Sequence, residues 1–413
     1  MKCRHCAQPL HLQFLDLGSA PPSNAYLSEA ALRAPETWYP LRVLVCTCCW
    51  LVQTDDYAAR ETMFSQDYAY FSSFSNSWLA HAKEYVMAMQ QRLRLNAHSC
   101  VVEVAANDGY LLQYVNEAGI PCYGIEPTAS TAAAARVKGI EMVERFFGVA
   151  LAHELVYAGR KADLIIANNV LAHVPDINDF VAGISHLLKP YGVATFEFPH
   201  LLRMVQGYQF DTAYHEHYSY LSLTVVKRIC AANGLKLIDV ETLPTHGGSL
   251  RVFAVRADAI NHPQATSGCN SRVQQLLAEE SKAGMLEEKF YSGFQDKALY
   301  IKRVLLSFLL HCQAQGVTVG AYGAAAKGNT LLNFAGVRPD LLPYVVDKNP
   351  AKIGMYMPGS RIPIVDEVQL INHQPDRVLI LPWNLRDELA FQLGYVRDWG
   401  GQLVVVVPQL EII

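Results

Sequence analysis

Short apolar runs of strand length, separated by stretches of helix length, constrain the fold of this chain more than any other feature. Four runs lie in its middle, SCVVEVA, CYGIEP, ADLIIANNV and GVATFEFP, and four lie near its end, VTVGAYG, YVVDKNP, RVLILPW and QLVVVVP. Strands that alternate with helices form mostly parallel sheets covered by helices. We therefore expect an α/β protein with two separate sheets.

The chain is long enough for several domains. Its 413 residues are 51% hydrophobic and 17% charged, which permits a sizeable core and excludes wholesale disorder. At roughly 100–200 residues per domain, two to three domains are expected. We place a small cysteine-rich domain at 1–62, the first α/β domain at 63–260 and a second, smaller one at 261–413. Two helices are predicted within 271–315.

Charge and hydropathy exclude several classes of protein. The net charge of −4, without a run of either sign, argues against a nucleic-acid partner. Apolar stretches stay shorter than the roughly 18 residues that a membrane helix needs, and residues 1–10 lack the apolar centre of a signal peptide. We expect a cytoplasmic protein without a membrane partner, and a monomer.

Two CxxC pairs, Cys3 with Cys6 and Cys46 with Cys49, predict a metal site near the start of the chain. Four thiolates complete a tetrahedral zinc shell and leave no position open for a substrate. The zinc is therefore expected to be structural, adding stability that so small a region cannot obtain from its own core. Cys48 is an alternative ligand in the second pair.

The loop after the first strand of the middle block has the character of a cofactor site. Small residues there let the backbone approach a ligand, and Glu126, ending the next strand, is placed for a ribose diol. Because GxGxxG is absent, S-adenosylmethionine suits this loop better than NAD; an ordinary tight turn is the alternative. The candidate cofactor residues are Glu103, Ala105, Asn107, Gly109, Tyr110, Glu126 and Asn168.

Polar residues concentrate in YHEHYSY at 214–220. Histidine titrates near neutrality, and an adjacent carboxylate can orient a catalytic imidazole. On a regular strand, residue 217 would face away from residues 214 and 216, so convergence requires a loop or a bulge, which we predict. His173 in LAHVP is a further candidate, although a lone histidine in an apolar setting can also be a core residue.

Two later loops are candidates for phosphate binding. HGGSLRV places Ser249 and Arg251 at the start of a strand, where Arg251 offers a planar fork to phosphate, or else is solvated beside a tight turn. GAYGAAAKGNTLLNF contains Lys327 and Asn329 and superficially resembles a Rossmann glycine loop. Its glycine spacing, GxxGxxxxG, supports NAD binding only weakly.

Taken in order, these motifs resemble one family, the nucleotide-sugar C-methyltransferases of deoxysugar biosynthesis. The resemblance is carried by the paired CxxC, YAYFSSFSNSW, EVAANDGYLL, IEPT, NNVLAHV, YHEHYSYLS and HGGSLRV, and by AAAKGNTLLN and VVDKNPAKIG near the end. It implies a zinc-binding N-terminal domain, a seven-stranded class I methyltransferase domain that uses S-adenosylmethionine, and a Rossmann-like C-terminal domain without its own NAD. The implied reaction methylates carbon 3 of a TDP-4-keto-deoxysugar.

The resemblance also implies catalytic roles. Tyr214, Glu216 and His217 match the family's Tyr-x-Glu-His, with His217 as general base and Glu216 holding the sugar or the base. His173 matches a second active-site histidine, expected to hydrogen-bond the ketone or enolate oxygen.

Tyrosine and C-terminal residues complete the implied site. Tyr68 and Tyr70 are both candidates for a tyrosine near the sugar; spacing favours Tyr68, and packing between domains is the alternative. Lys327 and Asn329 are expected to meet the diphosphate or the thymidine.

Other functions remain open at this point. One alternative is an O- or N-methyltransferase that acts on a nucleotide sugar. Another is an NAD(P)-dependent nucleotide-sugar oxidoreductase using the late glycine-rich loop. A third is a zinc-containing interaction module without activity, against which the histidine and tyrosine cluster argues.

Overall fold

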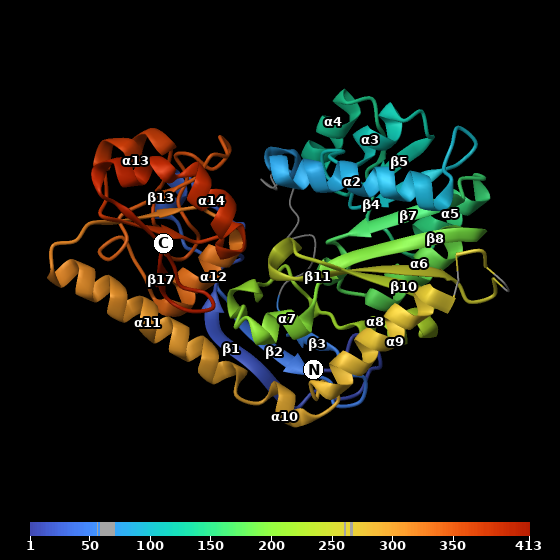
Figure 1. Ribbon diagram of the computed structural model, residues 1–413, viewed down its shortest axis with the longest axis horizontal. Helices are drawn as coiled ribbons and strands as arrows, with labels where there is room; N and C mark the ends of the chain where they lie inside the picture. The colour runs from blue at the N-terminus through green and yellow to red at the C-terminus, as the bar shows by residue number, and fades with distance from the viewer. Residues whose placement is uncertain (56, 58–70, 260–261, 265–266) are drawn as a thin grey trace.

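A computed structural model describes residues 1–55, 57, 71–259, 262–264 and 267–413 of the chain. Two α/β lobes stand side by side, and the N-terminal sheet lies at the base between them (Figure 1). The expected domain limits at 62 and 260 fall outside the described residues and stay predictions. The expected α/β class with separate sheets is confirmed.

The central lobe is a seven-stranded sheet in the order β10-β11-β8-β7-β4-β5-β6. The five strands from β8 to β6 run parallel, whereas β11 is antiparallel to both of its neighbours. The strands are β4 (Val101–Val104), β5 (Cys122–Ile125), β6 (Glu141–Val143), β7 (Ala162–Asn168), β8 (Leu188–Pro199), β10 (Leu235–Leu243) and β11 (Ser249–Arg256).

Helices cover both faces of this sheet, which explains the apolar strand sequences. Val101 packs into one core and its neighbour Val102 into another, because successive side chains of a strand point to opposite faces. One face carries α2 (Asn76–Leu93), α3 (Leu112–Glu117) and α4 (Ala129–Val137). The other carries α5 (Val149–Tyr157), α6 (Ile177–Leu187), α8 (Leu223–Ala232) and α9 (Ser267–Lys282).

The C-terminal lobe is a six-stranded sheet in the order β14-β13-β12-β15-β16-β17, parallel except for its last strand. The four expected strands are found as β12 (Val319–Tyr322), β13 (Val345–Val346), β15 (Arg377–Ile380) and β16 (Gln402–Val405). Two short strands, β14 (Ile364–Val365) and β17 (Glu411–Ile412), were not anticipated. Its helices are α12 (Ala326–Ala335), α13 (Glu367–His373) and α14 (Arg386–Gln392).

Helices α9, α10 (Glu288–Tyr291) and α11 (Phe294–Ala314) connect the two lobes, close to the two helices predicted for 271–315. The 21-residue α11 runs along the lower edge of the C-terminal lobe (Figure 1). Within the described ranges, no helix combines the length and apolar composition needed to cross a membrane.

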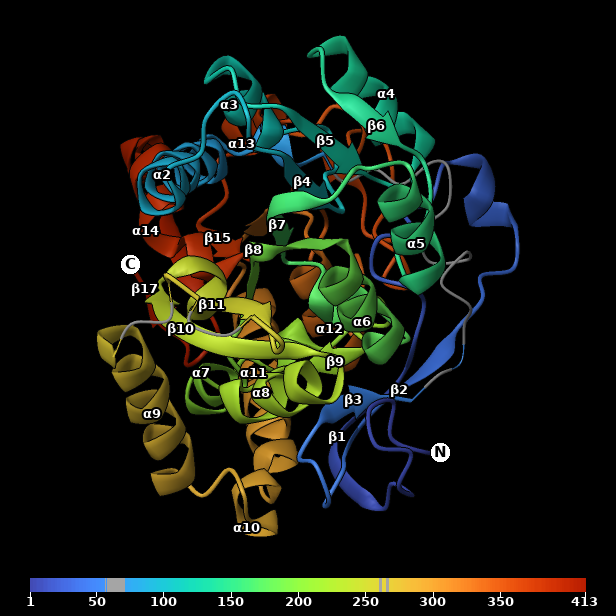
Figure 2. The same ribbon diagram turned by 90° about the vertical axis from the view of Figure 1, so that its right-hand side faces the viewer.

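The N-terminal sheet contains β1 (Leu12–Ala20), β2 (Tyr39–Val45) and β3 (Val52–Thr54). Its fourth strand, β9 (Ser219–Tyr220), comes from the middle of the chain and pairs antiparallel with β3 (Figure 2). This sheet has no core of its own. Phe14 of β1 stacks on Phe294 of α11 with ring centroids 4.5 Å apart, so the sheet shares the core of the C-terminal lobe.

The two CxxC pairs converge as expected for a zinc site. The four Sγ atoms of Cys3, Cys6, Cys46 and Cys49 all lie within 4.8 Å of one another. Four sulfurs at about 2.3 Å from a central ion would be about 3.8 Å apart, so this donor set fits zinc. Cys48 is exposed and outside the group, which settles the choice of ligand in the second pair.

Removing zinc should destabilise the chain. Cys3, Cys46 and Cys49 belong to the core that the central lobe also uses, so loss of the ion would loosen that core as well as the knuckles. We expect one zinc per chain by elemental analysis, and a lower Tm after a strong chelator is added.

Cys48→Ser is the matched control, since it removes a neighbouring thiol without touching the four ligands. It should retain zinc and Tm, whereas Cys46→Ser should lose both. A Cys46→Ser protein with unchanged zinc content would contradict the assignment.

Candidate active site

The expected cofactor residues gather at one edge of the central sheet. Strands β4, β5 and β7 are parallel and adjacent, so their carboxyl ends meet there. Glu126 directly follows β5, and Asn168 is the last residue of β7. Ligands of open α/β sheets bind outside the carboxyl ends of the strands.

Glu126 is buried and organises the loop after β4. One carboxylate oxygen accepts a hydrogen bond from the backbone N–H of Asn107 at 3.0 Å, and the other accepts from that of Thr128 at 2.9 Å. Each oxygen keeps a further lone pair, so the carboxylate can still accept from two ribose hydroxyls. Burial raises the pKa of Glu126.

Ala105 and Asn107 shape this loop, because both have positive φ, 59° and 49°. The buried Oδ1 of Asn168 and Oε2 of Glu103 have no hydrogen-bond partner among the described residues. Burial raises the pKa of Glu103 well above its usual range, and Tyr110, at the end of the loop, opposes this rise. Unpaired polar atoms on two adjacent strands, β4 and β7, together with the carboxylate of Glu126 after β5, fit the polar groups of S-adenosylmethionine.

Gly109 also has a packing role, and its expected place beside the cofactor stays a prediction. A Cβ at this position would lie 2.4 Å from Cδ1 of Ile140 and 3.1 Å from Cβ of Ala135. With φ of 73°, the residue also lies in the left-handed region that favours glycine.

The segment 214–217 is a turn, as predicted, and it brings Tyr214 and His217 together. The backbone N–H of His217 donates to the carbonyl of Tyr214, and the Tyr214 hydroxyl lies 2.6 Å from Nε2 of His217. Nδ1 of His217 lies 2.9 Å from the Thr212 carbonyl, which can only accept. His217 therefore carries its proton on Nδ1, and Nε2 is the basic nitrogen.

His173 lies beside this pair. Its ring centroid is 4.6 Å from that of His217, and its Nδ1 donates to the carbonyl of Glu216 at 2.7 Å. Burial lowers the pKa of His173 to about 4, and burial together with His173 lowers that of His217 well below its usual value. Both rings are neutral at pH 7, so His217 is available as a base.

Glu216 turns away from His217. Its Oε1 accepts hydrogen bonds from the backbone and side-chain N–H groups of Asn24, at 3.2 and 3.1 Å. Its role in holding the base is therefore not supported by the geometry. Oε2 is buried without a partner among the described residues, which leaves a contact with a substrate open to it.

The N-terminal strand β3 holds the catalytic turn in place. The Thr54 hydroxyl donates to the carbonyl of His217 at 3.1 Å, and the Thr54 N–H donates to that of Tyr218 at 3.1 Å. Arg4, inside the first CxxC pair, also donates to the Tyr218 carbonyl, at 3.2 Å. The zinc region thus contacts the backbone that carries the candidate base.

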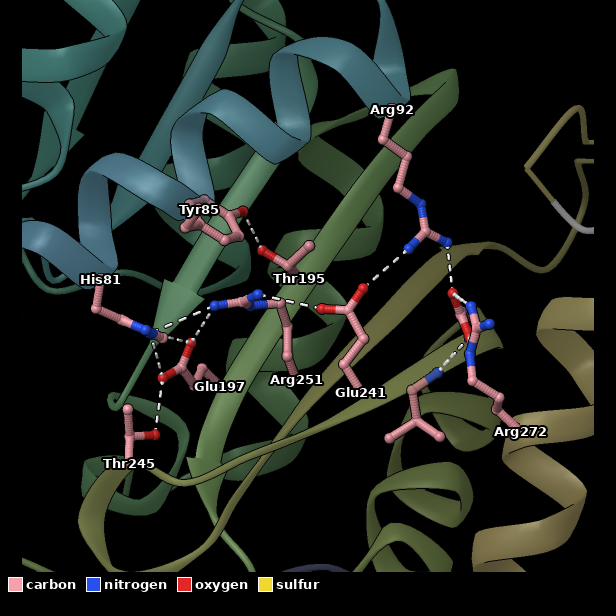
Figure 3. Close-up of polar contacts among 11 residues, drawn as sticks. His81, Tyr85, Arg92, Thr195, Glu197, Glu241, Thr245, Arg251 and Arg272 are labelled. Atoms are coloured by element: carbon pink, nitrogen blue, oxygen red, sulfur yellow. Dashed lines mark hydrogen bonds and ion pairs between the residues drawn. The ribbon is translucent and has the colours of Figure 1, made fainter.

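Arg251 is held by carboxylates, which corrects its expected phosphate role. Its guanidinium donates to Glu197 at 3.0 Å and to Glu241 at 3.1 Å, and His81 also bonds Glu197 (Figure 3). Burial raises the pKa of Glu197, but His81 and Arg251 outweigh it and the net shift is downward. The Ser249 hydroxyl donates to the Thr245 carbonyl at 2.9 Å, so it closes the preceding loop instead of facing a ligand.

Lys327 stands where the two lobes meet. Its ammonium lies 4.5 Å above the ring of Trp383 and 3.2 Å from Oδ1 of Asn384, and burial lowers its pKa to about 8. The Trp383 indole donates to Asp211 of the central lobe at 2.7 Å. A partly buried cation at this junction remains a candidate for phosphate.

Asn329 and the tyrosines complete the list of expected residues. Asn329 is fully buried and donates to the carbonyl of Ser23 at 2.6 Å, so it fastens α12 to the N-terminal segment. This placement does not support contact with a nucleotide. Tyr68 and Tyr70 lie outside the described residues.

Several residues near the site were missed by the sequence analysis: Trp78, His81, Asp211, His246 and Trp383. Trp78 stacks between His81 and Tyr110 and contacts His246. His246 had a signal, since it precedes Gly247 and Gly248 in HGGSLRV. Trp78 and Trp383 end two segments quoted above, YAYFSSFSNSW and RVLILPW, whereas His81 and Asp211 stand in segments without a motif.

The chain is similar to known proteins along its length. Three protein families match successive parts: a zinc binding domain over residues 3–64, a methyltransferase domain over 78–240 and a C-methyltransferase C-terminal domain over 244–408. The C-methyltransferase NovU of Streptomyces niveus is 32% identical over 412 residues, covering 100% of this chain and 96% of that protein.

Solved structures overlap the central lobe more distantly. The magnesium protoporphyrin IX methyltransferase of Synechocystis PCC 6803 with bound S-adenosylmethionine is 17% identical and covers 49% of this chain and 100% of its own, with a TM-score of 0.37. The 1,6-didemethyltoxoflavin-N1-methyltransferase of Burkholderia thailandensis, also 17% identical, covers 50% and 95% with a TM-score of 0.36. The assignment does not depend on scores this low. The assignment rests instead on the 32% identity to a C-methyltransferase along the full length of this chain. The chain therefore belongs to the C-methyltransferase family and is an S-adenosylmethionine-dependent enzyme of that family.

Proposed function

We propose that this enzyme methylates carbon 3 of a TDP-4-keto-deoxysugar through an enolate. The observation that carries the proposal is the Tyr214–His217 contact of 2.6 Å beside the His173 ring, because it combines a neutral base with further hydrogen-bonding groups. Carbon methylation next to a ketone requires both a base for the carbon-bound proton and donors for the oxygen that becomes negative.

His217 takes the proton from carbon 3 at Nε2, after the Tyr214 hydroxyl, which occupies this lone pair at 2.6 Å, has given way to the substrate. Its Nδ1–H stays on the Thr212 carbonyl, which fixes the tautomer and stabilises the imidazolium that forms. His173 donates its Nδ1–H to the Glu216 carbonyl, so the Nε2 of its neutral ring can only accept. The expected bond from His173 to the enolate oxygen is therefore not supported, and a tyrosine is left as the donor to that oxygen. S-adenosylmethionine supplies the methyl group.

The nucleotide part of the substrate lies between the central and C-terminal lobes. Lys327 supports this placement, because its ammonium is partly buried at the junction and its contacts there are an amide oxygen and the face of Trp383. The charge of the nearby Asp211 raises the pKa of Lys327 and so partly offsets the effect of burial. A bound diphosphate would supply further negative charge to this lysine.

The oxidoreductase alternative is less well supported by the late loop. In a dinucleotide site, the carboxylate of Asp347 would bind the ribose, but here it is paired with the ammonium of Lys352 at 3.6 Å, besides accepting from the backbone N–H groups of Ala324 and Asn349. The Tyr26 hydroxyl also bonds the Ala324 carbonyl at 2.6 Å, so an N-terminal side chain already contacts this loop. An O-methyltransferase would also use a base on its hydroxyl group, so the atom that carries the new methyl group distinguishes it from a C-methyltransferase.

A direct assay tests the proposed reaction. The enzyme is incubated with S-adenosylmethionine and a TDP-4-keto-deoxysugar, and the product should gain the mass of one methyl group, located on carbon 3 by NMR. A methyl on oxygen or nitrogen would overturn the enolate mechanism, and the absence of any product would overturn the substrate class.

His217→Ala should abolish proton abstraction. Removing the imidazole that contacts Tyr214 should stop the exchange of the carbon-3 proton with deuterated solvent, which NMR follows without turnover. Affinity for S-adenosylhomocysteine should be nearly unchanged, because the cofactor residues lie on other strands.

His215→Gln is the matched control in the same turn. His215 faces the Tyr39 carbonyl at 3.1 Å, a bond that glutamine can retain, so exchange should persist. Exchange retained in His217→Ala, or lost equally in His215→Gln, would reassign the base.

The pH profile should reflect the lowered histidine pKa values. A base acts in its unprotonated form, so kcat/KM rises as pH increases through its pKa. Because burial holds the pKa of His217 well below 6.5, the acid limb should lie well below 6.5 and the profile should be level across neutrality. An acid limb centred at or above 6.5 would contradict this assignment.

A further inference from the structure

The loop between β10 and β11 holds a histidine in a backbone conformation that histidine does not favour. Three consecutive residues, His246, Gly247 and Gly248, have φ of 55°, 84° and 116°. Glycine adopts positive φ without cost, but a side chain with a Cβ pays for it. Such strain persists only where the surroundings fix it, and it concentrates at ligand sites.

Contacts from both lobes fix this loop. Gln209 donates to the Gly247 carbonyl at 2.9 Å, and a Cβ at Gly247 would lie 2.6 Å from the ring of Trp383. A Cβ at Gly248 would lie 2.8 Å from Cγ of Arg203. The hydroxyl of Thr245 approaches Glu197 at 3.4 Å (Figure 3). Of the three residues with positive φ, 246 is therefore the one at which a side chain fits.

The imidazole of His246 makes no hydrogen bond to any residue that the structure describes, although it is only half exposed. Its ring centroid lies 5.3 Å from that of Trp78, so an aromatic face holds it. Burial, assisted by the charge of Lys327, lowers its pKa to about 4, which leaves a neutral ring with one donor and one acceptor. A half-buried polar ring without a partner is available to a ligand.

The neighbours of His246 locate that ligand. Trp78 also lies 5.9 Å from Tyr110 of the cofactor loop, and Trp383 on the other side of the loop carries Lys327 at 4.5 Å. His246 thus stands between the candidate cofactor edge and the candidate phosphate-binding cation. A nucleotide sugar that reaches both the cofactor edge and Lys327 therefore has to pass His246.

We infer that His246 is a substrate-binding residue, whose ring N–H donates a hydrogen bond to an oxygen of the nucleotide sugar. This inference rests on the proposed function for the class of substrate. The strained backbone is then explained, since of the three residues with positive φ only 246 has room for a side chain that contacts the ligand.

Two substitutions separate binding from a purely structural role. Glycine and asparagine tolerate the left-handed conformation better than histidine, so His246→Gly and His246→Asn should keep or raise the Tm. Both remove the imidazole, and KM for the nucleotide sugar should rise about tenfold, the usual effect of losing one hydrogen bond. The Kd of S-adenosylhomocysteine should stay unchanged.

Gln374→Gly is the matched control. Gln374 is exposed, has φ of 44° and ends α13, far along the chain from the site. Glycine should relieve the backbone strain at position 374 and raise the Tm without changing KM for the nucleotide sugar. This variant therefore shows the effect of strain relief in the absence of any change at the substrate site.

The outcomes are distinct. An unchanged KM in both His246 variants, or a lower Tm in both, would overturn the inference. Calorimetric binding of the same TDP-sugar separates this result from failure of the proposed reaction. If the wild-type chain binds the sugar but does not methylate it, the proposed reaction is wrong. In that case the ratio of the variant and wild-type Kd values for the sugar still tests the role of His246. A wild-type chain that does not bind the sugar overturns both.

Discussion

Hydrogen bonds from β3 to the segment 217–220 are the interaction on which the catalytic arrangement depends. Strand β9 has only two residues, too few to be stable alone, and β3 supplies its partner. Thr54 then fixes the carbonyls of His217 and Tyr218. Gln53 links this strand to zinc, since its side-chain N–H lies 3.3 Å from Sγ of Cys3. The small N-terminal domain therefore positions the candidate catalytic residues.

The same domain also connects the two lobes by sharing their cores. Its cysteines pack in the core of the central lobe, and Phe14 packs with Phe294 in the core of the C-terminal lobe. Contact between domains is therefore apolar and continuous, which restrains relative motion more than a polar interface would. Trp383 and Asp211 add a direct bond between the lobes beside the site.

Burial acts differently on paired and unpaired groups around the site. Glu197 and Arg251 are both buried and neutralise each other, so they serve as framework for β8, β11 and α2. Burial lowers the pKa values of His173, His217 and His246 and keeps these three rings neutral. Neutral imidazoles can exchange protons and hydrogen bonds with a substrate at pH 7, whereas a charge locked in an ion pair cannot.

The sequence by itself determined the elements that depend on local pattern. Apolar runs located the main strands of both lobes, two CxxC pairs identified the zinc ligands, and period-two geometry required a turn at 214–217. The sequence did not predict which polar partners a side chain meets when the partners are far apart in the chain. From the sequence, Arg251 was expected to bind phosphate, but in the folded chain it bonds Glu197 of β8 and Glu241 of β10. Similarly, Glu216 accepts a hydrogen bond from Asn24, which is far away in the sequence. His246 gained its significance only from φ and from Trp78, because backbone strain and contacts between distant segments are properties of the folded chain and leave no local pattern in the sequence.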